Sequence, residues 1–509
     1  MKNTVETVQD STGMIRQKDE EISRLKDRIK WLERALFSSR SERIVSTNDD
    51  QPEFEDLLAE LEELSQELEQ DHQPEKPSVK LPKKRKKRRS LDELIPDDLP
   101  REEIIIDVPE EERVCPKTGE AFKRIGEEIT EKIAFKPGSY YAKRYIRPKY
   151  AHPNDPSYGI LCEPMIDCAI AGSSFDESFT AGVAVDKCAY HLPLYRQQER
   201  MKNAGIEISR QTLSQHYMRG SKTLKPLFDL MKEKIIASGY LFTDDTTVQL
   251  QMKGKGKTVT GRMWVYIAGG DNPAYIVFDF TADRKAEHTI KFIEGFTGYI
   301  HADAYGGYDE LFRKDEITEC ACWMHVRRKF FEAEDSPVEF RRTILKLIQN
   351  LYRYERILNK ADLETRLKVR KEKVAPIVEA IFNRARSELT DPKSKILPRS
   401  KIRKAITYLL NQEEALKTFL TDSHIKPDNG ASERAIRPLA IGRKNWLFAG
   451  SKNGGEATAI WLSLIQTCRS MDIDPFAYLD DVLRKINSCS DLETLLPDRW
   501  KKAQENSEK

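Results

Sequence analysis

The first hydrophobic pattern along the chain is a heptad repeat. Ile15, Ile22, Ile29 and Leu36 recur every seven residues, with charged residues between them. Apolar residues at this spacing predict a helix that supercoils with a partner. We therefore expect residues 1–45 to form a coiled coil and the protein to be a homo-oligomer, at least a dimer. The alternative is one amphipathic helix that packs on its own domain.

A second pattern, with a period of two, begins after Gly239. It predicts strands at 240–250, 262–268 and 274–280, a helix at 286–296, a strand at 299–303, and a short strand at 320–323 before a basic helix. This is the element order of the ribonuclease-H-like α/β fold. Residues 337–422 are helical, highly charged and too long for a loop, so we interpret them as an all-α insertion.

Helical spacing interrupted by a glycine turn precedes this core. Residues 195–202, a turn at Gly205 and residues 209–218 read as helix, turn, helix. In a helix-turn-helix motif, the second helix would offer Ser209, Arg210 and Gln211 to a DNA groove. Helix pairs joined by a glycine turn are also common in ordinary protein cores.

These patterns divide the chain into a multidomain α+β protein. We expect a coiled-coil helix at 1–45, an acidic helix and basic linker at 46–90, a small β-rich unit at 91–165, a helix-turn-helix domain at 166–236, the first part of the catalytic core at 237–336, the all-α insertion at 337–425, core completion with C-terminal helices at 426–490, and a polar tail at 491–509.

The overall charge says little about partners. Lys and Arg total 85 against 83 Asp and Glu, a formal net charge of +2. Residues 83–89, however, are all Lys or Arg. Like charges at this density keep a segment unfolded, and the run is either a grip on nucleic-acid phosphates or a solubilising linker.

Cysteine usage and the N-terminus bear on the compartment. The eight cysteines show no Cys-x-x-Cys pair and no dense spacing, so we read them as mostly reduced thiols. The first residues do not resemble a signal peptide, and no apolar run approaches ~18–20 residues. We expect a cytoplasmic protein without a membrane partner.

Three carboxylates carry the candidate chemistry. Asp244 and Asp303 end apolar strand-like runs, and Glu433 opens a helix-like stretch. Two carboxylates ~4 Å apart repel by roughly 4 kcal/mol at an effective dielectric of about 20. Two Mg²⁺ (or Mn²⁺) ions would offset this repulsion and would suit phosphoryl transfer. The alternative for Glu433 is a surface ion pair with Arg437, four residues later.

Basic residues near these carboxylates are candidates for gripping DNA phosphates. They are Arg327, Arg328, Arg434, Arg437, Arg443 and Lys444. Cys320, Cys322 and His325 lie close together in the sequence, but without a fourth partner nearby we interpret them as packing residues.

Several stretches resemble the transposases of the bacterial insertion sequence 66 family, from the N-terminal zipper almost to the C-terminus. They are residues 36–43 (LFSSRSER), 191–197 (HLPLYRQ), 209–213 (SRQTL), 243–246 (TDDT), 301–308 (HADAYGGY), 322–330 (CWMHVRRKF), 428–438 (DNGASERAIRP) and 442–448 (GRKNWLF). The resemblance implies a DDE-type transposase with a ribonuclease-H-like core. Asp244 and Asp303 match the catalytic aspartates, and Glu433 matches the catalytic glutamate.

The chain departs from the family pattern at three places. Asp245 replaces the Glu that usually follows the first aspartate, and we expect its side chain to face away. Gly430 replaces the second residue of an Asn-Asn pair. In the family's zinc unit, Cys115 and at best His152 remain at ligand positions. Since structural zinc generally takes four ligands, we expect structural zinc to be unlikely.

The leading interpretation is a transposase that binds double-stranded DNA at the terminal inverted repeats of its element, cleaves the 3′ ends and joins them to target DNA, with possible accessory proteins from the same element. The rival is a catalytically silent DNA-binding or regulatory relative. A third interpretation is a nuclease that cuts without joining. All three carboxylates are present, which favours the first interpretation over the second.

Overall fold

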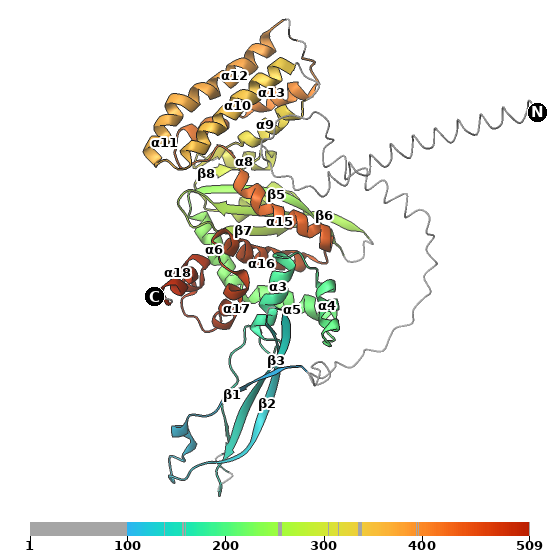
Figure 1. Ribbon diagram of the computed structural model, residues 1–509, viewed down its shortest axis with the longest axis vertical. Helices are drawn as coiled ribbons and strands as arrows, with labels where there is room; N and C mark the ends of the chain where they lie inside the picture. The colour runs from blue at the N-terminus through green and yellow to red at the C-terminus, as the bar shows by residue number, and fades with distance from the viewer. Residues whose placement is uncertain are drawn as a thin grey trace, which may run out of the picture. The chain divides into compact units, whose positions relative to one another are not determined.

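A computed structural model describes residues 99–507, except 137, 155–156, 158, 253–256, 304, 314, 334–337, 393 and 395 (Figure 1). All of these residues lie in the second of two contact units, Arg88–Lys509. The predicted coiled coil at 1–45 and the acidic helix and basic linker at 46–90 lie outside the described residues.

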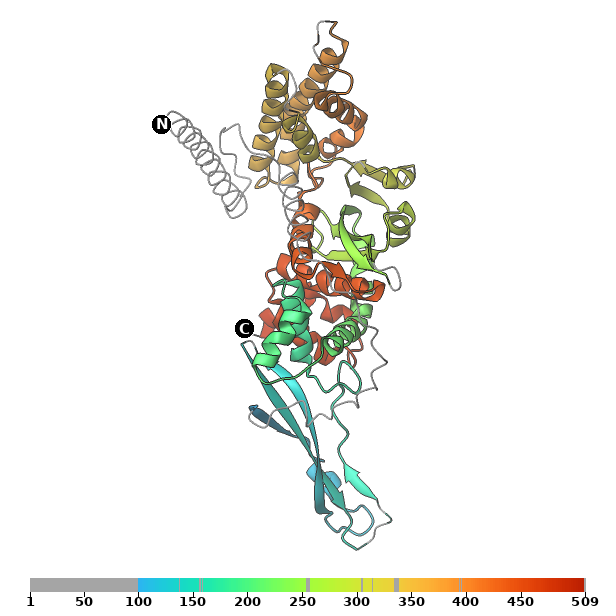
Figure 2. The ribbon, with the colours of Figure 1, turned by 90° about the vertical axis from the view of Figure 1, so that its right-hand side faces the viewer.

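The first described unit is a β-sheet. Its strands are β1 (Arg101–Ile105), β2 (Lys123–Lys136), β3 (Ser139–Ala151) and β4 (Ile160–Cys162). β3 lies between β1, with which it runs parallel, and β2, with which it runs antiparallel, while β4 pairs with the end of β3. Figure 2 shows β2 and β3 as one long paired ribbon.

Four helices follow this sheet. They are α3 (Glu177–Cys188), α4 (Leu194–Asn203), α5 (Arg210–Thr223) and α6 (Lys225–Ile236). The predicted turn between α4 and α5 contains Gly205, whose φ of 81° favours glycine. Ser209 caps α5 by accepting a hydrogen bond from the Thr212 N–H. The predicted order of helix, glycine turn and helix is therefore present.

The central sheet has the strand order β7-β6-β5-β8-β9. Its strands are β5 (Tyr240–Gln251), β6 (Thr258–Ala268), β7 (Ile276–Thr281), β8 (Gly298–His301) and β9 (Ile317–Cys320), with the short β10 (Phe448–Ala449) beside β5. β6 runs antiparallel to both β5 and β7, whereas β8 runs parallel to β5, and β9 runs parallel to β8. The predicted strand at 320–323 is wrong: β9 ends at Cys320, and Trp323 begins a helix.

Two features explain how this sheet is bounded. Gly298 (φ 118°) begins β8, and a Cβ there would lie 2.1 Å from the Gly239 carbonyl oxygen, so only glycine permits this approach to β5. At the other edge of the sheet, α16 (Lys452–Ser470) supplies partners for β7 backbone amides that an edge strand would otherwise leave unpaired. The Ile276 N–H donates to the Thr467 hydroxyl, and the Phe278 N–H donates to the Ser463 hydroxyl.

The segment between β9 and the last part of the core is entirely helical. It contains α9 (Trp323–Phe331), α10 (Val338–Leu358), α11 (Leu363–Val369), α12 (Ala375–Thr390), α13 (Lys401–Asn411) and α14 (Glu413–Lys417). Its two ends meet beside β9, because the Ala321 N–H donates to the Ala415 carbonyl and the Trp323 N–H to the Pro427 carbonyl. The chain can therefore leave the core and return to it at one place.

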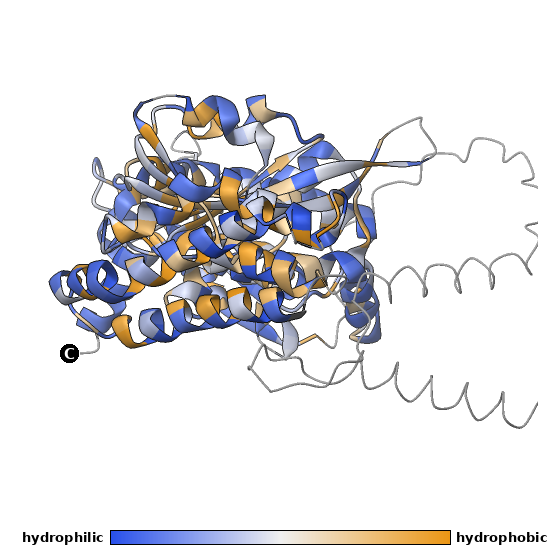
Figure 3. Cartoon of the chain, turned by 90° about the horizontal axis from the view of Figure 1, so that it is seen from above, coloured by the Kyte–Doolittle hydropathy of each residue, from blue (hydrophilic) through white to orange (hydrophobic). Residues whose placement is uncertain are grey.

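The chain ends in helices that pack around α16. After α15 (Gly430–Trp446) and α16 come α17 (Pro475–Lys485) and α18 (Pro497–Ser507). Almost every residue of α16 from Gly455 to Cys468 is buried, as expected for a helix covered on all sides. Figure 3 shows blue and orange residues alternating along the outer helices. Among the described residues, no helix combines the length and apolarity needed to cross a bilayer.

Candidate active site and metal-binding residues

The three predicted carboxylates lie on three different elements. Asp244 is in β5, Asp303 follows the end of β8, and Glu433 is in the first turn of α15. β5 and β8 are adjacent and parallel, with Phe242 opposite His301. Two residues further along each strand are Asp244 and Asp303, so parallel pairing brings these two residues to the same end of the sheet.

The pKa of Asp244 shows that the carboxylates share one environment. The pKa of Asp244 is raised to about 7, first of all by burial and in part by the negative charges of Asp303, Asp245 and Glu433, while a hydrogen bond from the Asp245 N–H opposes the rise. Burial also raises the pKa of Asp303, while Arg284 opposes that shift. Clustered oxygen ligands with uncompensated negative charge fit hard divalent cations, so Asp244, Asp303 and Glu433 are suited to hold them.

Asp245 has a different environment from its neighbour. Its carboxylate accepts hydrogen bonds from Arg262 (3.0 Å) and from Arg284 (2.7 and 3.1 Å), and its side chain is only 2 % exposed. A second contact of Arg284 reaches Asp303, with NH2 3.9 Å from Oδ2. Asp245 is thus linked to the site through Arg284, a connection that strand alternation alone did not predict.

Both ends of α15 are fastened to β5. At its start, the fully buried Asn429 donates from Nδ2 to the Thr243 carbonyl at 2.8 Å, next to Asp244. Near its end, Arg443 NH1 donates to Thr246 Oγ1 (2.9 Å) and to the Thr247 carbonyl (2.7 Å). These bonds set the position of Glu433 relative to Asp244.

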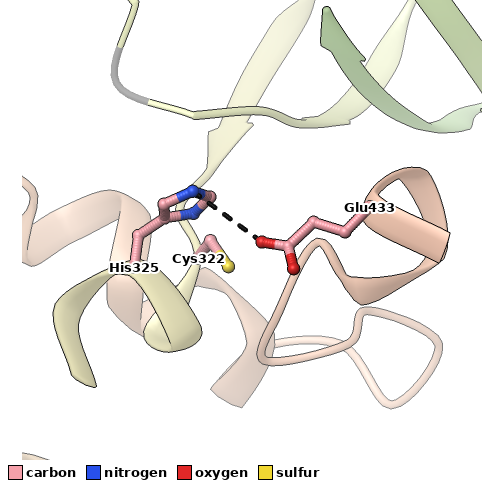
Figure 4. A group of neighbouring side chains, drawn as sticks. All are labelled: Cys322, His325 and Glu433. Atoms are coloured by element: carbon pink, nitrogen blue, oxygen red, sulfur yellow. Dashed lines mark ion pairs between the residues drawn. The ribbon is translucent and has the colours of Figure 1, made fainter. Parts of the chain in front are cut away.

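Glu433 also belongs to a second group of side chains, with Cys322 and His325 (Figure 4). One ligand atom from each residue lies within 4.8 Å of the others. His325 Nε2 and Arg328 NH2 lie 3.8 and 3.7 Å from Glu433 Oε1. Among the described residues, the ion-pair partners of Glu433 are therefore His325 and Arg328 on α9, and the alternative pair with Arg437 is not formed.

The Cys322 sulfur lies where two helices begin. Cys322 is the N-cap residue of α9, and its sulfur accepts a hydrogen bond from the N–H of Asn429, the N-cap residue of α15, at 3.3 Å. Burial raises the pKa of the Cys322 thiol to about 12 and lowers the pKa of His325. From the sequence, Cys322 and His325 were interpreted as packing residues because no further metal ligand lies near them along the chain. Glu433, the third member of the group, is more than 100 residues away.

The predicted DNA-binding residues are spread over three helices. Ser209 serves as the cap of α5, while Arg210 and Gln211 are exposed in its first turn. On α9, Arg328 is exposed and Arg327 is half-buried against the ring of Phe331. On α15, Arg434, Arg437 and Lys444 are exposed, whereas Arg443 is half-buried and bound to β5. The structure does not test whether any of them contacts DNA.

A further group of ligand-type residues lies in the β-sheet unit. Cys115 begins a tight turn, because the Gly119 N–H donates to its carbonyl and its own N–H donates to the Glu120 carbonyl, both at 2.9 Å. His152, which follows β3, has Nε2 3.4 Å from Glu120 Oε2 and 3.5 Å from Thr118 Oγ1. Cys115 and His152 are both buried. A thiol, an imidazole and a carboxylate thus occur on neighbouring segments.

Comparison with known proteins gives consistent matches along the chain. Four family models match: "Transposase IS66 family" at 172–457, "IS66 C-terminal element" at 463–497, "Transposase C of IS166 homeodomain" at 24–104 and "zinc-finger binding domain of transposase IS66" at 112–153. Two proteins of Sinorhizobium fredii, named uncharacterized proteins y4qI and y4hP, are each 32 % identical to the chain. The matches cover 95 % of this chain and 90 % of y4qI, and 80 % and 76 % for y4hP.

The expectation that structural zinc is unlikely is wrong. The zinc-finger model covers the segment that contains Cys115, Glu120 and His152, and the group of Cys322, His325 and Glu433 also has ligand types that bind zinc. The sequence argument failed because it counted cysteines at the spacing of a motif. Zinc ligands are selected by proximity in space, and they include imidazoles and carboxylates.

Proposed function

Because the chain belongs to the IS66 family of transposases, we propose that it is a DDE-type enzyme that binds the terminal inverted repeats of its insertion sequence, cleaves their 3′ ends and transfers the strands to target DNA. The observation that carries this proposal is the convergence of three elements on the buried Asp244: β8, which pairs with β5 just before Asp303, and the start of α15, which is hydrogen-bonded to Thr243 and carries Glu433. Retention of all three residues favours an active enzyme over a silent DNA-binding relative.

The strand order supports a ribonuclease-H-like core. Along the chain, β5, β6 and β7 are followed by a helix (Ala286–Phe292), β8 and β9, which is the order of strands and helix expected from the sequence; in space the strands are arranged β7-β6-β5-β8-β9. In this arrangement Asp244 comes from the central strand β5 and Asp303 from the adjacent β8. The helix α15 then supplies the third carboxylate from outside the sheet.

In the proposed mechanism, Asp244, Asp303 and Glu433 would hold divalent cations, and the chemistry such ions would supply when bound is activation of the attacking oxygen and stabilisation of charge on the leaving oxygen of a phosphodiester. Arg284 keeps positive charge beside Asp303 and is held in place by Asp245. The exposed Arg434 and Arg437 lie on the helix that carries Glu433 and are placed to bind DNA phosphates. Phosphate contacts would position the duplex, while the exposed start of α5 would read its bases.

Assembly is part of the proposal. Two element ends must be brought together before joining, so we propose that at least two copies act on double-stranded DNA through the heptad at residues 1–45. Accessory proteins of the same element are a further proposed partner.

The experiment is strand cleavage and joining on a labelled terminal-repeat duplex with Mg²⁺ or Mn²⁺. The wild type is compared with Glu433→Gln, and with Glu364→Gln as a matched control, because Glu364 is an exposed glutamate in the first turn of α11. We expect Glu433→Gln to lose about 10²–10³-fold in rate, the size of effect seen when one strong transition-state contact is removed. DNA binding should persist in both variants.

Other outcomes would change the proposal. Tight binding without chemistry in the wild type would identify a DNA-binding relative of a transposase. Metal-dependent nicking without joining would identify a nuclease. Equal activity of Glu433→Gln and Glu364→Gln would remove Glu433 from the site.

A further inference from the structure

We propose that Cys322, His325 and Glu433 form a zinc site that withholds Glu433 from Asp244 and Asp303, so that zinc inhibits the enzyme. The inhibitory part of this inference rests on the proposed function, in which Glu433 is catalytic. The zinc site itself stands on the geometry of the three side chains.

The ligand types select the ion. A sulfur, an imidazole nitrogen and a carboxylate oxygen are the donors that zinc prefers, whereas magnesium prefers oxygen alone. Tetrahedral zinc with bonds of about 2.0–2.1 Å places a nitrogen and an oxygen ligand about 3.3 Å apart. His325 Nε2 and Glu433 Oε1 are 3.8 Å apart, and all three ligand atoms lie within 4.8 Å. Small side-chain movements therefore suffice to complete three corners of the tetrahedron.

Two of the donor side chains have unused hydrogen-bonding capacity. Glu433 Oε1 and His325 Nδ1 are buried without a hydrogen-bond partner in the part of the chain that the structure describes. Buried polar atoms of this kind are costly and usually indicate a missing partner. A cation bound at Glu433 Oε1 would remove that cost at the carboxylate.

The surroundings of Cys322 favour a metal-bound thiolate. Its sulfur already accepts the N–H of Asn429 at 3.3 Å, and it lies at the starts of both α9 and α15. Helix starts carry partial positive charge, which stabilises an anionic sulfur. Zinc binding would replace the thiol proton, which is released to solvent.

The shared carboxylate links this site to catalysis. Glu433 contributes to the negative charge around Asp244, yet its Oε1 lies toward His325 and Arg328 on α9. Figure 4 shows the Glu433 side chain extending from α15 toward His325. A zinc ion held on that side would neutralise Glu433 and fix it to α9, so zinc and catalysis would compete for one residue.

The test separates this site from the zinc-finger segment. Cobalt(II) replaces zinc and gives a thiolate-to-cobalt absorption band for each cysteine-containing site. We compare the full-length wild type with Cys322→Ser and with Cys115→Ser, the matched control in the 112–153 segment. We expect Cys322→Ser to lose a cobalt–thiolate band that Cys115→Ser retains.

Zinc titration of strand cleavage at fixed Mg²⁺ provides the second readout. We expect the zinc concentration for half inhibition to rise at least about tenfold in Cys322→Ser, since losing a ligand should cost no less than losing its supporting contacts. In Cys115→Ser it should stay as in the wild type. His325→Asn provides a second variant if Cys322→Ser does not fold by circular dichroism.

Each outcome bears on one part of the proposal. Identical cobalt spectra in Cys322→Ser and the wild type would overturn the zinc site, whatever the activity. A lost band with unchanged zinc inhibition would overturn the competition for Glu433. If no DNA chemistry occurs in any sample, the proposed function fails, while the cobalt spectra still decide whether the site exists.

Discussion

Two clusters of charged side chains, one within the helical insertion and one beside β5, differ in how their charges are balanced. In the insertion, Arg370 is buried and forms two hydrogen bonds with Glu355, at 2.9 and 2.7 Å. Its remaining terminal nitrogen donates to the carbonyls of Phe419 and Asp422. Beside β5, negative charges accumulate around Asp244, and Glu433 Oε1 has no hydrogen-bond partner among the residues that the structure describes.

The difference shows what each cluster does. A buried ion pair whose hydrogen bonds are all satisfied holds helices in place and has no capacity for a ligand. A buried carboxylate such as Asp244, whose pKa is raised by burial and by neighbouring carboxylates, is unfavourable when charged and becomes favourable when cations bind. The insertion cluster is therefore structural, and the β5 cluster has the character of a binding site.

The largest expected effect comes from breaking the ion pair of the insertion cluster. Arg370→Met leaves Glu355 buried without its partner, which should reduce the free energy of unfolding by roughly 3–5 kcal/mol. Urea unfolding followed by circular dichroism measures this change. The double variant Arg370→Met/Glu355→Leu should recover most of the loss, because no unpaired charge remains. If the single and double variants lost the same free energy of unfolding, the stabilisation would come from the ion pair itself and not from avoiding an unpaired buried charge.

The next largest effect concerns the β5 cluster, where the buried negative charge of Asp244 should make stability depend on pH. The pKa of Asp244 in the folded protein is raised to about 7, above the ordinary aspartate value of 3.8. Between these values the folded protein holds a proton that the unfolded chain has released, so raising the pH favours unfolding. Without metal, stability should fall by up to about 4 kcal/mol from pH 4 to pH 7, at about 1.4 kcal/mol per pKa unit.

Asp244→Asn should remove this part of the pH dependence, and Asp229→Asn, at a half-exposed carboxylate that pairs with Lys225, should not. Urea titrations of the three proteins in EDTA between pH 4 and pH 7 make the comparison. Parallel curves for wild type and Asp244→Asn would mean that Asp244 is not held in an unfavourable charged state.

The smallest effect is expected at an exposed pair that belongs to neither cluster. Lys234 Nζ lies 2.6 Å from Glu493 Oε1, and the two side chains are 37 % and 48 % exposed. Lys234→Ala should change the free energy of unfolding by about 0.2–1 kcal/mol, less at high salt, because water screens the pair. A loss as large as that of Arg370→Met would show that burial does not explain the comparison.

Much of the fold followed from sequence patterns. The alternation with a period of two predicted the ends of β5 and β8 to within two residues of the observed ends. Gly205 correctly located the turn between α4 and α5. The error at 320–323 has a local cause: Cys320-Ala-Cys-Trp is apolar throughout, and such a run does not distinguish the end of a strand from the start of a buried helix.

The candidate site was only partly accessible in this way. Asp244, Asp303 and Glu433 were chosen from their local settings, and they remain the proposed catalytic residues. No sequence pattern indicated the hydrogen bond between Arg284 and Asp245 or the one between Asn429 and Thr243, because each joins residues more than 35 positions apart. The zinc prediction failed for the same reason, since it considered only ligands at motif spacing.

The sequence by itself determined most element types and the family, and it selected the carboxylates that are proposed for catalysis, because periodicity and short motifs depend on neighbouring residues. Tertiary structure alone decided which charges are neutralised and which are left open. Asp244 and Asp245 are adjacent and chemically identical, yet one has two arginine partners and the other faces carboxylates. Electrostatic energy depends on distance in space, and chain folding sets that distance.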